Sequence, residues 1–439
     1  MRIGNHRLQR ALRLVLLGLA TFAASFIAAE TKPQTPRNLI IVSLDTLRAD
    51  RLGCYGHPRP TSPSIDRIAA EGVVFDDASA TSPWTKPSHA SLLTGLYPRR
   101  NGAVAMDSVM RDDVVHIASL LKRHGFQTIG VVNNKLLQTQ GLERGFESLE
   151  YVEFEQGGRK GSPVTQRAIE NLEQRDRAKP LFAFVHYMDV HSDYRSLPKY
   201  EEMFVEPYDG YADGTTQQLY RFSLGLFDLN EKDVAHLLDL YDAGIRQLDD
   251  QLGRLFAYLE RQGLLADSLL VVLSDHGEEF LEHGSILHGH SQYQEVIRIP
   301  LIFHGPGVPA GARVAAPVSL IDIMPTCLSL LDLPVPEGLD GVTVHGLWEE
   351  DGARLDPRLL YFEADVVYPP PEPGLVPVGP LRAVRDDRYK LHFHMETTEV
   401  RLFDLAADPG EKVDLAGERS DVGKRLWQHL RRFLDYETE

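Results

Sequence analysis

Several short stretches of this sequence bring hydroxyl, carboxylate and imidazole groups close together along the chain. One of them is Thr85-Lys86-Pro87-Ser88-His89. Pro87 suits the first turn of a helix and Thr85 suits the residue that caps it, so we expect the Thr85 hydroxyl at a helix N-terminus, where free N–H groups favour an anion. A hydroxyl in that place is a candidate nucleophile. The same pattern also fits an ordinary helix cap, and Ser88 offers a second hydroxyl.

Carboxylate and imidazole groups supply a candidate metal site. Asp45 follows one apolar run, and the pair Asp275-His276 follows another. A carboxylate oxygen and an imidazole nitrogen can bind the same divalent ion. Each group alone also fits an ordinary turn, so a shared metal site requires that the fold bring them together.

Histidines gather in two further places. The stretch His186-Tyr-Met-Asp189-Val-His191 ends an apolar run, and His288-Gly-His290 lies just before another one. Histidines of a hydrophobic core would be scattered through helices and strands, whereas these lie where strands are expected to end. They are therefore candidates for contact with a ligand.

The apolar runs beside these groups have the form of buried strands. Their hydrophobic residues are continuous rather than alternating, which is typical of parallel strands covered on both faces. Alternating strands and helices predict a mostly parallel, doubly wound α/β sheet, in which ligands bind beyond the carboxyl ends of the strands. We predict strands at 38–45, 128–133, 181–187, 268–274 and 299–304, and helices at 65–70, 117–124 and 232–262.

The pattern changes toward the C-terminus. Residues 38–336 hold the alternating strands and helices, whereas residues 337–439 are expected to form a smaller α+β subdomain. Its antiparallel strands are predicted at 381–393 and 400–404, and an amphipathic helix at 422–436 follows them.

The first 29 residues have the layout of an export signal. Arginines precede an uncharged run that ends at Ala28-Ala29. This layout predicts a cleaved signal peptide at 1–29, or else an uncleaved anchor formed by residues 11–29. The expected location is periplasmic or secreted, with a membrane tether through the N-terminus as the alternative.

Composition narrows the classes of function. The chain has 439 residues, of which 43% are hydrophobic and 25% charged, which suits a folded globular protein rather than a disordered one. Its net charge of -17 would repel a phosphate backbone, so we predict no nucleic-acid partner. The two cysteines, Cys54 and Cys327, have no Cys or His beside them at metal-ligand spacing, and we expect free thiols.

Taken together, these stretches resemble the sulfatase branch of the alkaline phosphatase superfamily. The order, spacing and strand-end placement of the motifs match jointly over most of the chain. The matching stretches are residues 44–56, 85–98, 186–191, 274–284 with His288-Gly289, 319–326, 388–390 and 402–411.

The resemblance implies a metal held by Asp45, Asp275 and His276 together with the Thr85 oxygen. Sulfatases, however, have Cys or Ser where Thr85 stands, and oxidise it to formylglycine. They have Arg where His89 stands, usually a second Asp at Thr46, and Asn or Gln at His276. A threonine is not a substrate for that oxidation. The sequence therefore looks like the threonine-nucleophile relatives in the superfamily, among them phosphotransferases, phosphodiesterases and phosphonate hydrolases.

The mechanism that the resemblance implies is a covalent one. Thr85 would attack phosphorus or sulfur of a small anionic phosphorylated or sulfated ester, and water would then release the enzyme ester. His191, His288 and Lys86 would neutralise substrate oxygens or protonate the leaving group. Zn²⁺ or Mn²⁺ is favoured over Ca²⁺, because His276 brings nitrogen to the site. Asp189 has a looser match and is a candidate for a second metal site together with His191 and His288.

Other classes of function stay open from the sequence. An inactive relative could bind anionic glycans or lipid head groups, although such a protein is expected to lose its ligands. A serine hydrolase using Ser291 is a further alternative, but the stretch Gly289-His-Ser291-Gln-Tyr293 lacks the closing Gly of a nucleophile elbow. The sequence names neither the substrate nor the oligomeric state.

Overall fold

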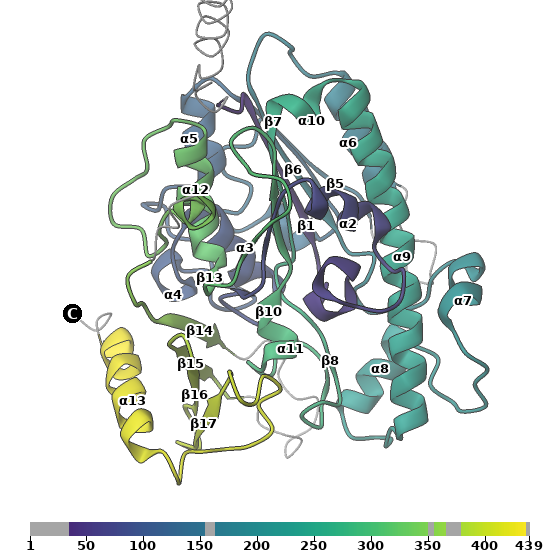
Figure 1. The fold of residues 1–439 in the computed structure, drawn as a ribbon, viewed down its shortest axis with the longest axis vertical. Coiled ribbons are helices and arrows are strands. Elements are labelled where there is room, and N and C mark those ends of the chain that lie inside the picture. Colours follow the sequence, from purple (N-terminus) through teal and green to yellow (C-terminus); the bar gives the residue numbers. More distant parts are fainter. Residues whose placement is uncertain (1–34, 154–162, 350–354, 366–378, 436–439) are drawn as a thin grey trace, which may run out of the picture. The chain divides into compact units, whose positions relative to one another are not determined.

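A computed structural model describes residues 35–153, 163–349, 355–365 and 379–435 (Figure 1). The predicted signal peptide or anchor at 1–29 lies outside these residues. In the part of the chain that is described, no helix is long and apolar enough to cross a membrane.

The central element is an eight-stranded, mostly parallel sheet (Figure 1). Its strand order is β12-β2-β11-β7-β1-β6-β4-β5. The strands are β1 (Asn38–Leu44), β2 (Val73–Phe75), β4 (Gln127–Val132), β5 (Ser148–Tyr151), β6 (Leu181–Tyr187), β7 (Ser268–Leu273), β11 (Leu301–His304) and β12 (Ala312–Val314).

The three central strands end together. β1 pairs in parallel with β6 and with β7, and Leu44 lies opposite Tyr187 while Ser43 lies opposite Leu273. Every residue of these strands is buried, as their continuous apolar runs predict. Because their carboxyl ends share one edge, the residues that follow them meet there.

β11 is an exception to the parallel arrangement. It pairs antiparallel with β7 on one side and with β2 on the other. The sequence predicted one strand at 299–304. The structure has β11 only at Leu301–His304, because Ile299 belongs to the short strand Arg298–Ile299 of a separate sheet, and β11 runs opposite to both of its neighbours. An apolar run does not encode the direction of a strand, so only the connections on either side decide it.

Helices cover both faces of the sheet (Figure 1). The helices α3, α5 and α12 pack on one hydrophobic cluster, and α2, α6 and α9 pack on the other. A capping box of Asn230 and Asp233 starts the longest of them, α9. Their bounds are α2 (Pro63–Ala70), α3 (Thr85–Thr94), α5 (Ile117–Arg123), α6 (Pro163–Glu173), α9 (Glu231–Arg261) and α12 (Ile323–Leu330).

Shorter elements connect these layers and support the edge of the sheet. Two small sheets, β10-β3-β13 and β8-β9, lie among them. The bounds are β3 (Ala78–Ser79), β8 (Glu279–Phe280), β9 (Ile286–Leu287), β10 (Arg298–Ile299), β13 (Val318–Ser319), α4 (Pro98–Asn101), α7 (Pro198–Phe204), α8 (Thr216–Ser223), α10 (Leu264–Asp267) and α11 (Gln294–Ile297).

A smaller C-terminal subdomain is present, as predicted. Its four-stranded antiparallel sheet has the order β14-β15-β16-β17, and α13 (Ser420–Asp435) packs on it through Leu426 and Leu430. The stretch predicted as one strand at 381–393 is a hairpin of two strands, and the first strand was not predicted. The bounds are β14 (Leu360–Ala364), β15 (Leu381–Arg385), β16 (Tyr389–His394) and β17 (Val400–Asp404).

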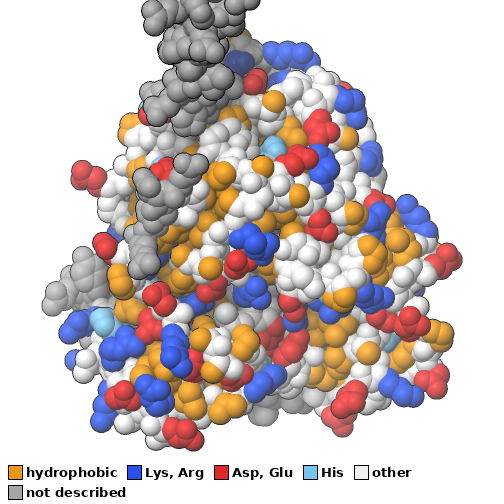
Figure 2. Space-filling model, in the orientation of Figure 1, with side chains coloured by type: hydrophobic (Ala, Val, Ile, Leu, Met, Phe, Trp, Pro, Cys, Tyr) orange, Lys and Arg blue, Asp and Glu red, His pale blue; other side chains and the backbone are white. Residues whose placement is uncertain are grey.

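Acidic and basic side chains are intermixed over the face of the molecule that Figure 2 shows. On this face the charges therefore form no extended basic surface of the kind that binds nucleic acid.

Candidate active site

Thr85 and Asp45 meet at the carboxyl edge of the sheet. Asp45 follows β1 and is fully buried, and Thr85 is the first residue of α3. The Thr85 hydroxyl donates toward Asp45 Oδ2 at 3.3 Å. Trp84, not Thr85, is the residue that caps the helix, so the predicted helix start is displaced by one residue. The hydroxyl still lies in the first turn, where backbone N–H groups are free.

Asp275 and His276 complete a compact group with Asp45. All three side chains have no exposed surface, and one ligand atom from each lies within 4.8 Å of the other two. His276 Nε2 is 3.5 Å from Asp45 Oδ1 and 3.5 Å from Asp275 Oδ2. The fold therefore brings Asp45 together with Asp275 and His276, which lie more than 200 residues further along the sequence.

The protonation of His276 favours a cation between these groups. Its Nδ1 donates to the Gly277 carbonyl at 2.9 Å, which leaves the lone pair on Nε2 facing two carboxylate oxygens. Asp45 Oδ1, Asp275 Oδ2 and His276 Nε2 are buried and have no hydrogen-bond partner among the described residues. Three buried acceptors facing one another are unfavourable unless a cation lies between them. These residues therefore fit a divalent metal ion.

The two carboxylates also have perturbed pKa values. Burial and the neighbouring Asp45 carboxylate raise the pKa of Asp275 well above its ordinary value. Burial would also raise the pKa of Asp45, but the hydrogen bond from His186 and the nearby histidine charges hold it below its ordinary value. Burial lowers the pKa of His276 to about 3, which keeps its imidazole neutral and able to bind a metal.

The turn after β1 holds Asp45 in place through Thr46. Thr46 has a φ of 59°, a left-handed conformation that is rare for a β-branched residue and is common at functional sites. The Tyr241 hydroxyl donates to the Thr46 carbonyl at 2.6 Å, and the Thr46 N–H points at Asp275 Oδ1 at 3.4 Å.

His89 has a role that the sequence did not predict. Its Nε2 is 2.9 Å from the Ser43 hydroxyl, and its Nδ1 is 2.8 Å from the Thr85 carbonyl and 3.4 Å from Asp275 Oδ2. It thus contacts both the Thr85 backbone and the Asp275 carboxylate. Its position four residues after Thr85, one helical turn away, was the available signal.

The predicted substrate histidines lie beside the metal cluster. The His288 ring centroid is 4.5 Å from that of His276 and 4.9 Å from that of His191. Nδ1 of His288 is 2.9 Å from Oε1 of Glu278, a fully buried residue whose pKa is raised to about 8 by burial. Sequence reasoning missed Glu278, although it follows the Asp275-His276 pair by two residues.

The residues of the predicted second metal site are not among the possible ion-binding clusters of the described residues. Among the described residues, the clusters that could hold an ion are Asp45-Asp275-His276, His89-His186-Asp275 and Glu279-His283-Glu295. Asp189, His191 and His288 are not such a cluster, because their ligand atoms do not all approach one another closely enough.

The predicted substrate contact of Lys86 is also corrected. Its buried ammonium donates to the carbonyls of Ala105, at 2.8 Å, Met106, at 3.1 Å, and Ser108. An ammonium has three N–H donors, and all three have acceptors here. Lys86 therefore holds the loop at 105–108 and does not contact a substrate.

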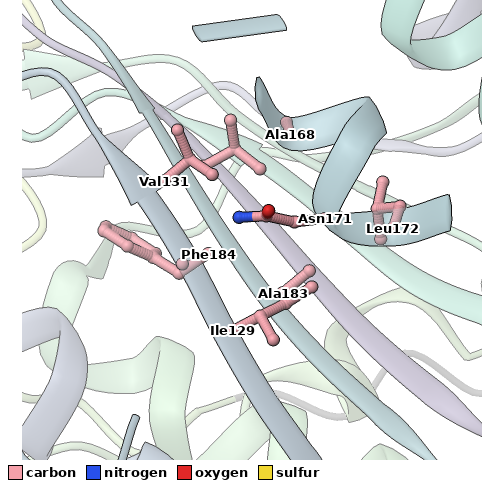
Figure 3. Close-up of a pocket in the computed structure, with 9 residues that line it drawn as sticks. Ile129, Val131, Ala168, Asn171, Leu172, Ala183 and Phe184 are labelled. Atoms are coloured by element: carbon pink, nitrogen blue, oxygen red, sulfur yellow. The ribbon is translucent and has the colours of Figure 1, made fainter. Parts of the chain in front are cut away.

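The two alternative hydroxyls are already bonded elsewhere. Ser88 donates to the Ser82 carbonyl at 2.8 Å, and Ser291 donates to Glu279 Oε2 at 2.9 Å. An apolar cavity on one face of the sheet is likewise not part of the site. It lies between β4, β6 and α6, and it is lined by residues such as Ile129, Ala183 and Leu172 (Figure 3).

Comparison with known families decides the assignment. A family model described as Sulfatase matches residues 37–333, and a second one, described as N-sulphoglucosamine sulphohydrolase, C-terminal, matches residues 282–435. This chain belongs to the sulfatase family. It is therefore an ester hydrolase of the sulfatase type, and its mostly parallel sheet with a smaller C-terminal sheet is that of alkaline-phosphatase-like sulfatase structures.

Individual relatives agree with the family. N-acetylglucosamine-6-O-sulfatase of Bacteroides thetaiotaomicron is 25% identical, and the alignment covers 95% of this sulfatase and 89% of the relative. A solved structure of a protein in complex with its substrate D-glucosamine-2-N,6-O-disulfate has a TM-score of 0.75 at 24% identity, covering 92% of this chain and 98% of that one. Phosphonate monoester hydrolase of Agrobacterium radiobacter has a TM-score of 0.71 at 22% identity, covering 92% and 95%.

Proposed function

We propose that this sulfatase-family protein is an exported, metal-dependent hydrolase that cleaves a small anionic ester through a covalent intermediate on Thr85. The observation that carries the proposal is the position of the Thr85 hydroxyl, 3.3 Å from Asp45 Oδ2 at the edge of the buried Asp45-Asp275-His276 cluster. The complete set of ligands argues against an inactive binding protein.

Threonine sets the chemistry of the proposed intermediate. Formylglycine is formed from Cys or Ser, whereas oxidation of Thr85 would give a ketone at best. A formylglycine hydrate can expel sulfate by collapse of its gem-diol. Thr85 has only one hydroxyl, so an ester formed on it cannot release the transferred group by that route. Water must therefore break the bond between the Thr85 oxygen and the transferred group, a route better matched to phosphorus than to sulfur.

Different residues of the site have different roles in the proposed reaction. Asp45, Asp275, His276 and the Thr85 oxygen would hold the metal, which when bound would lower the pKa of the Thr85 hydroxyl and neutralise the anionic substrate. The Thr85 hydroxyl loses its proton to solvent, its oxygen attacks phosphorus or sulfur in line, and the bond to the leaving-group oxygen breaks. Glu278 contacts His288 at Nδ1 and orients the ring, so Nε2 is the nitrogen that would protonate the leaving-group oxygen. His191 lies beside it.

We infer Zn²⁺ or Mn²⁺ as the metal. His276 supplies an imidazole nitrogen to the cluster, and calcium prefers shells made entirely of oxygen.

We also infer a substrate class and a location. An N-acetylglucosamine-6-O-sulfatase is among the relatives and a phosphonate monoester hydrolase is among the similar structures, which supports a small sulfated, phosphorylated or phosphonate ester as substrate. The signal-like residues 1–29 support a periplasmic or secreted protein, either cleaved or tethered. Cell fractionation checks the location, and recovery of the full-length chain in the cytoplasm would contradict it.

A paired assay tests the substrate preference. Matched aryl phosphate, phosphonate and sulfate esters are given to metal-replete protein made in a host without the formylglycine-generating enzyme. We expect kcat/KM for a phosphate ester or phosphonate to exceed that for the matching sulfate by at least about tenfold. Faster turnover of the sulfate would show that Thr85 supports sulfate hydrolysis.

A further inference from the structure

Two C-terminal stretches, residues 388–390 and 402–411, match the family but take no part in the proposed chemistry. They contribute Lys390 on β16 and Glu411 in the loop after β17. Both side chains have no exposed surface, and Lys390 Nζ lies 3.2 Å from Glu411 Oε1. Desolvating two charges is costly, and replacing such a pair by apolar residues is often neutral for stability. We therefore expect the pair to have a role other than stabilising the fold.

Glu411 bonds to both ends of the segment that carries His288. At the start of the segment, His283 Nε2 is 3.1 Å from the Glu411 carbonyl oxygen. At its end, the Gln294 N–H donates to Glu411 Oε2 at 2.7 Å. His288 lies between these two anchors, directly after β9.

Lys390 strengthens the second anchor. Its ammonium donates to the Gln292 carbonyl and lies 3.4 Å from the Gln294 side-chain oxygen. His392, on the same strand, approaches Glu411 Oε1 at 2.9 Å. The C-terminal sheet thus fixes the Glu411 carboxylate, and the carboxylate fixes the segment.

The backbone of Glu411 is also held in an unusual conformation. Its φ is 53°, in the left-handed region that a residue other than glycine rarely adopts. Such a conformation persists only where surrounding contacts determine it. The bonds of both its carbonyl and its carboxylate supply those contacts.

We propose that Glu411 and Lys390 form a positioning pair through which the C-terminal subdomain sets the place of His288 beside His276. This inference rests on the proposed function, in which His288 protonates the leaving-group oxygen. A displacement of about 1 Å in a group that serves the reaction can cost up to about a hundredfold in rate. Loss of the two charges and of the side-chain anchor at Gln294 should therefore reduce turnover without removing any group that contacts the substrate.

The first experiment measures the segment itself. Lys390→Met combined with Glu411→Leu removes both charges and the side-chain anchor at Gln294, but leaves the Glu411 carbonyl that bonds His283 in place, whereas Glu411→Gln keeps an acceptor for the Gln294 N–H. Asp404→Asn is the matched control, because the bonds of Asp404 with Arg388 and the turn at 406–407 stay within the C-terminal subdomain. We expect amide hydrogen exchange in residues 286–294 to be at least about tenfold faster in the double variant, intermediate in Glu411→Gln and unchanged in the control. Unchanged exchange in the double variant would overturn the proposal.

The second experiment asks whether the pair acts through His288. The double variant is made in the native background and in a His288→Ala background, and kcat/KM is measured for an aryl phosphonate. We expect a loss of about tenfold or more in the native background and less than about twofold in the other, because residues that act as a unit are not additive. Equal losses in both backgrounds would show a merely structural role and overturn the positioning claim.

The two experiments separate failure of this inference from failure of the proposed function. If His288→Ala alone leaves kcat/KM unchanged, the role of His288 in the proposed function is wrong. In that case, faster exchange in the double variant would still support the anchoring of the segment by Glu411 and Lys390, but the proposed effect of the anchoring on catalysis would be wrong.

Discussion

At the scale of single residues, the chemistry depends on which hydroxyl faces the carboxylates. The Thr85 hydroxyl points at Asp45, whereas the Ser88 hydroxyl, one turn further along, is engaged by the Ser82 carbonyl. Only the first is placed to attack a substrate bound at the cluster.

Substitution of the two hydroxyls distinguishes them. Thr85→Ala should lower kcat by roughly 10³ or more, because it removes the nucleophile, while Ser88→Ala should have a much smaller effect. Steady-state kinetics on the same phosphonate ester measures both. The reverse ranking would assign the nucleophile to Ser88.

Residues that follow buried strands could be predicted, and residues that act through packing could not. Asp45 and Asp275 were found because parallel strands end at one edge of the sheet. His89 and Glu278 were missed because their roles depend on neighbours from other elements. Lys86 was assigned to the substrate because its sequence neighbours were, but the loop at 105–108 supplies its acceptors.

At the scale of elements, strand and helix positions follow from the sequence more closely than strand direction does. The predicted strand at 38–45 is β1, and the predicted helix at 232–262 is α9. The antiparallel direction of β11 and the extra strand β14 depend on pairing with distant segments, which a local pattern does not carry.

The lowered pKa of Glu411 predicts how the stability of the protein depends on pH. Burial opposes its ionisation, but Lys390 and His392 hold the pKa of Glu411 at about 2. A carboxylate with a lowered folded-state pKa stabilises the protein above its unfolded pKa of about 4.3, and this contribution is lost as pH falls toward 2. Glu411→Gln should therefore flatten the loss of unfolding free energy between about pH 4.5 and 2, by roughly 2 kcal/mol.

Urea unfolding at a series of pH values measures this slope. Glu399→Gln is the control, because Glu399 lies directly before β17 in an exposed pair with Arg401. An acid limb as steep in Glu411→Gln as in the native protein would contradict the assignment of the lowered pKa to Glu411.

At the scale of the whole molecule, the proposed metal joins segments that are far apart in the sequence. Asp45 follows β1, Thr85 begins α3, and Asp275 and His276 follow β7. An ion that binds only the folded state stabilises it, by about 2.7 kcal/mol at a hundred times its dissociation constant.

Removal of the metal should therefore lower both activity and Tm. Dialysis against a chelator should abolish turnover and reduce Tm, and Zn²⁺ or Mn²⁺ should restore both. Elemental analysis of protein purified without added metal identifies the resident ion. Calcium alone, at one ion per chain with full activity, would contradict the preference for Zn²⁺ or Mn²⁺.

The central claim is the covalent intermediate on Thr85, and trapping it is the most direct test. Metal-replete protein is mixed with a slowly hydrolysed aryl phosphonate, quenched in acid during the first turnover and digested for mass spectrometry. The account predicts a phosphonyl group on Thr85, in the native protein and not in Thr85→Ala. The same group on Ser88, or on a histidine of the site, would contradict it.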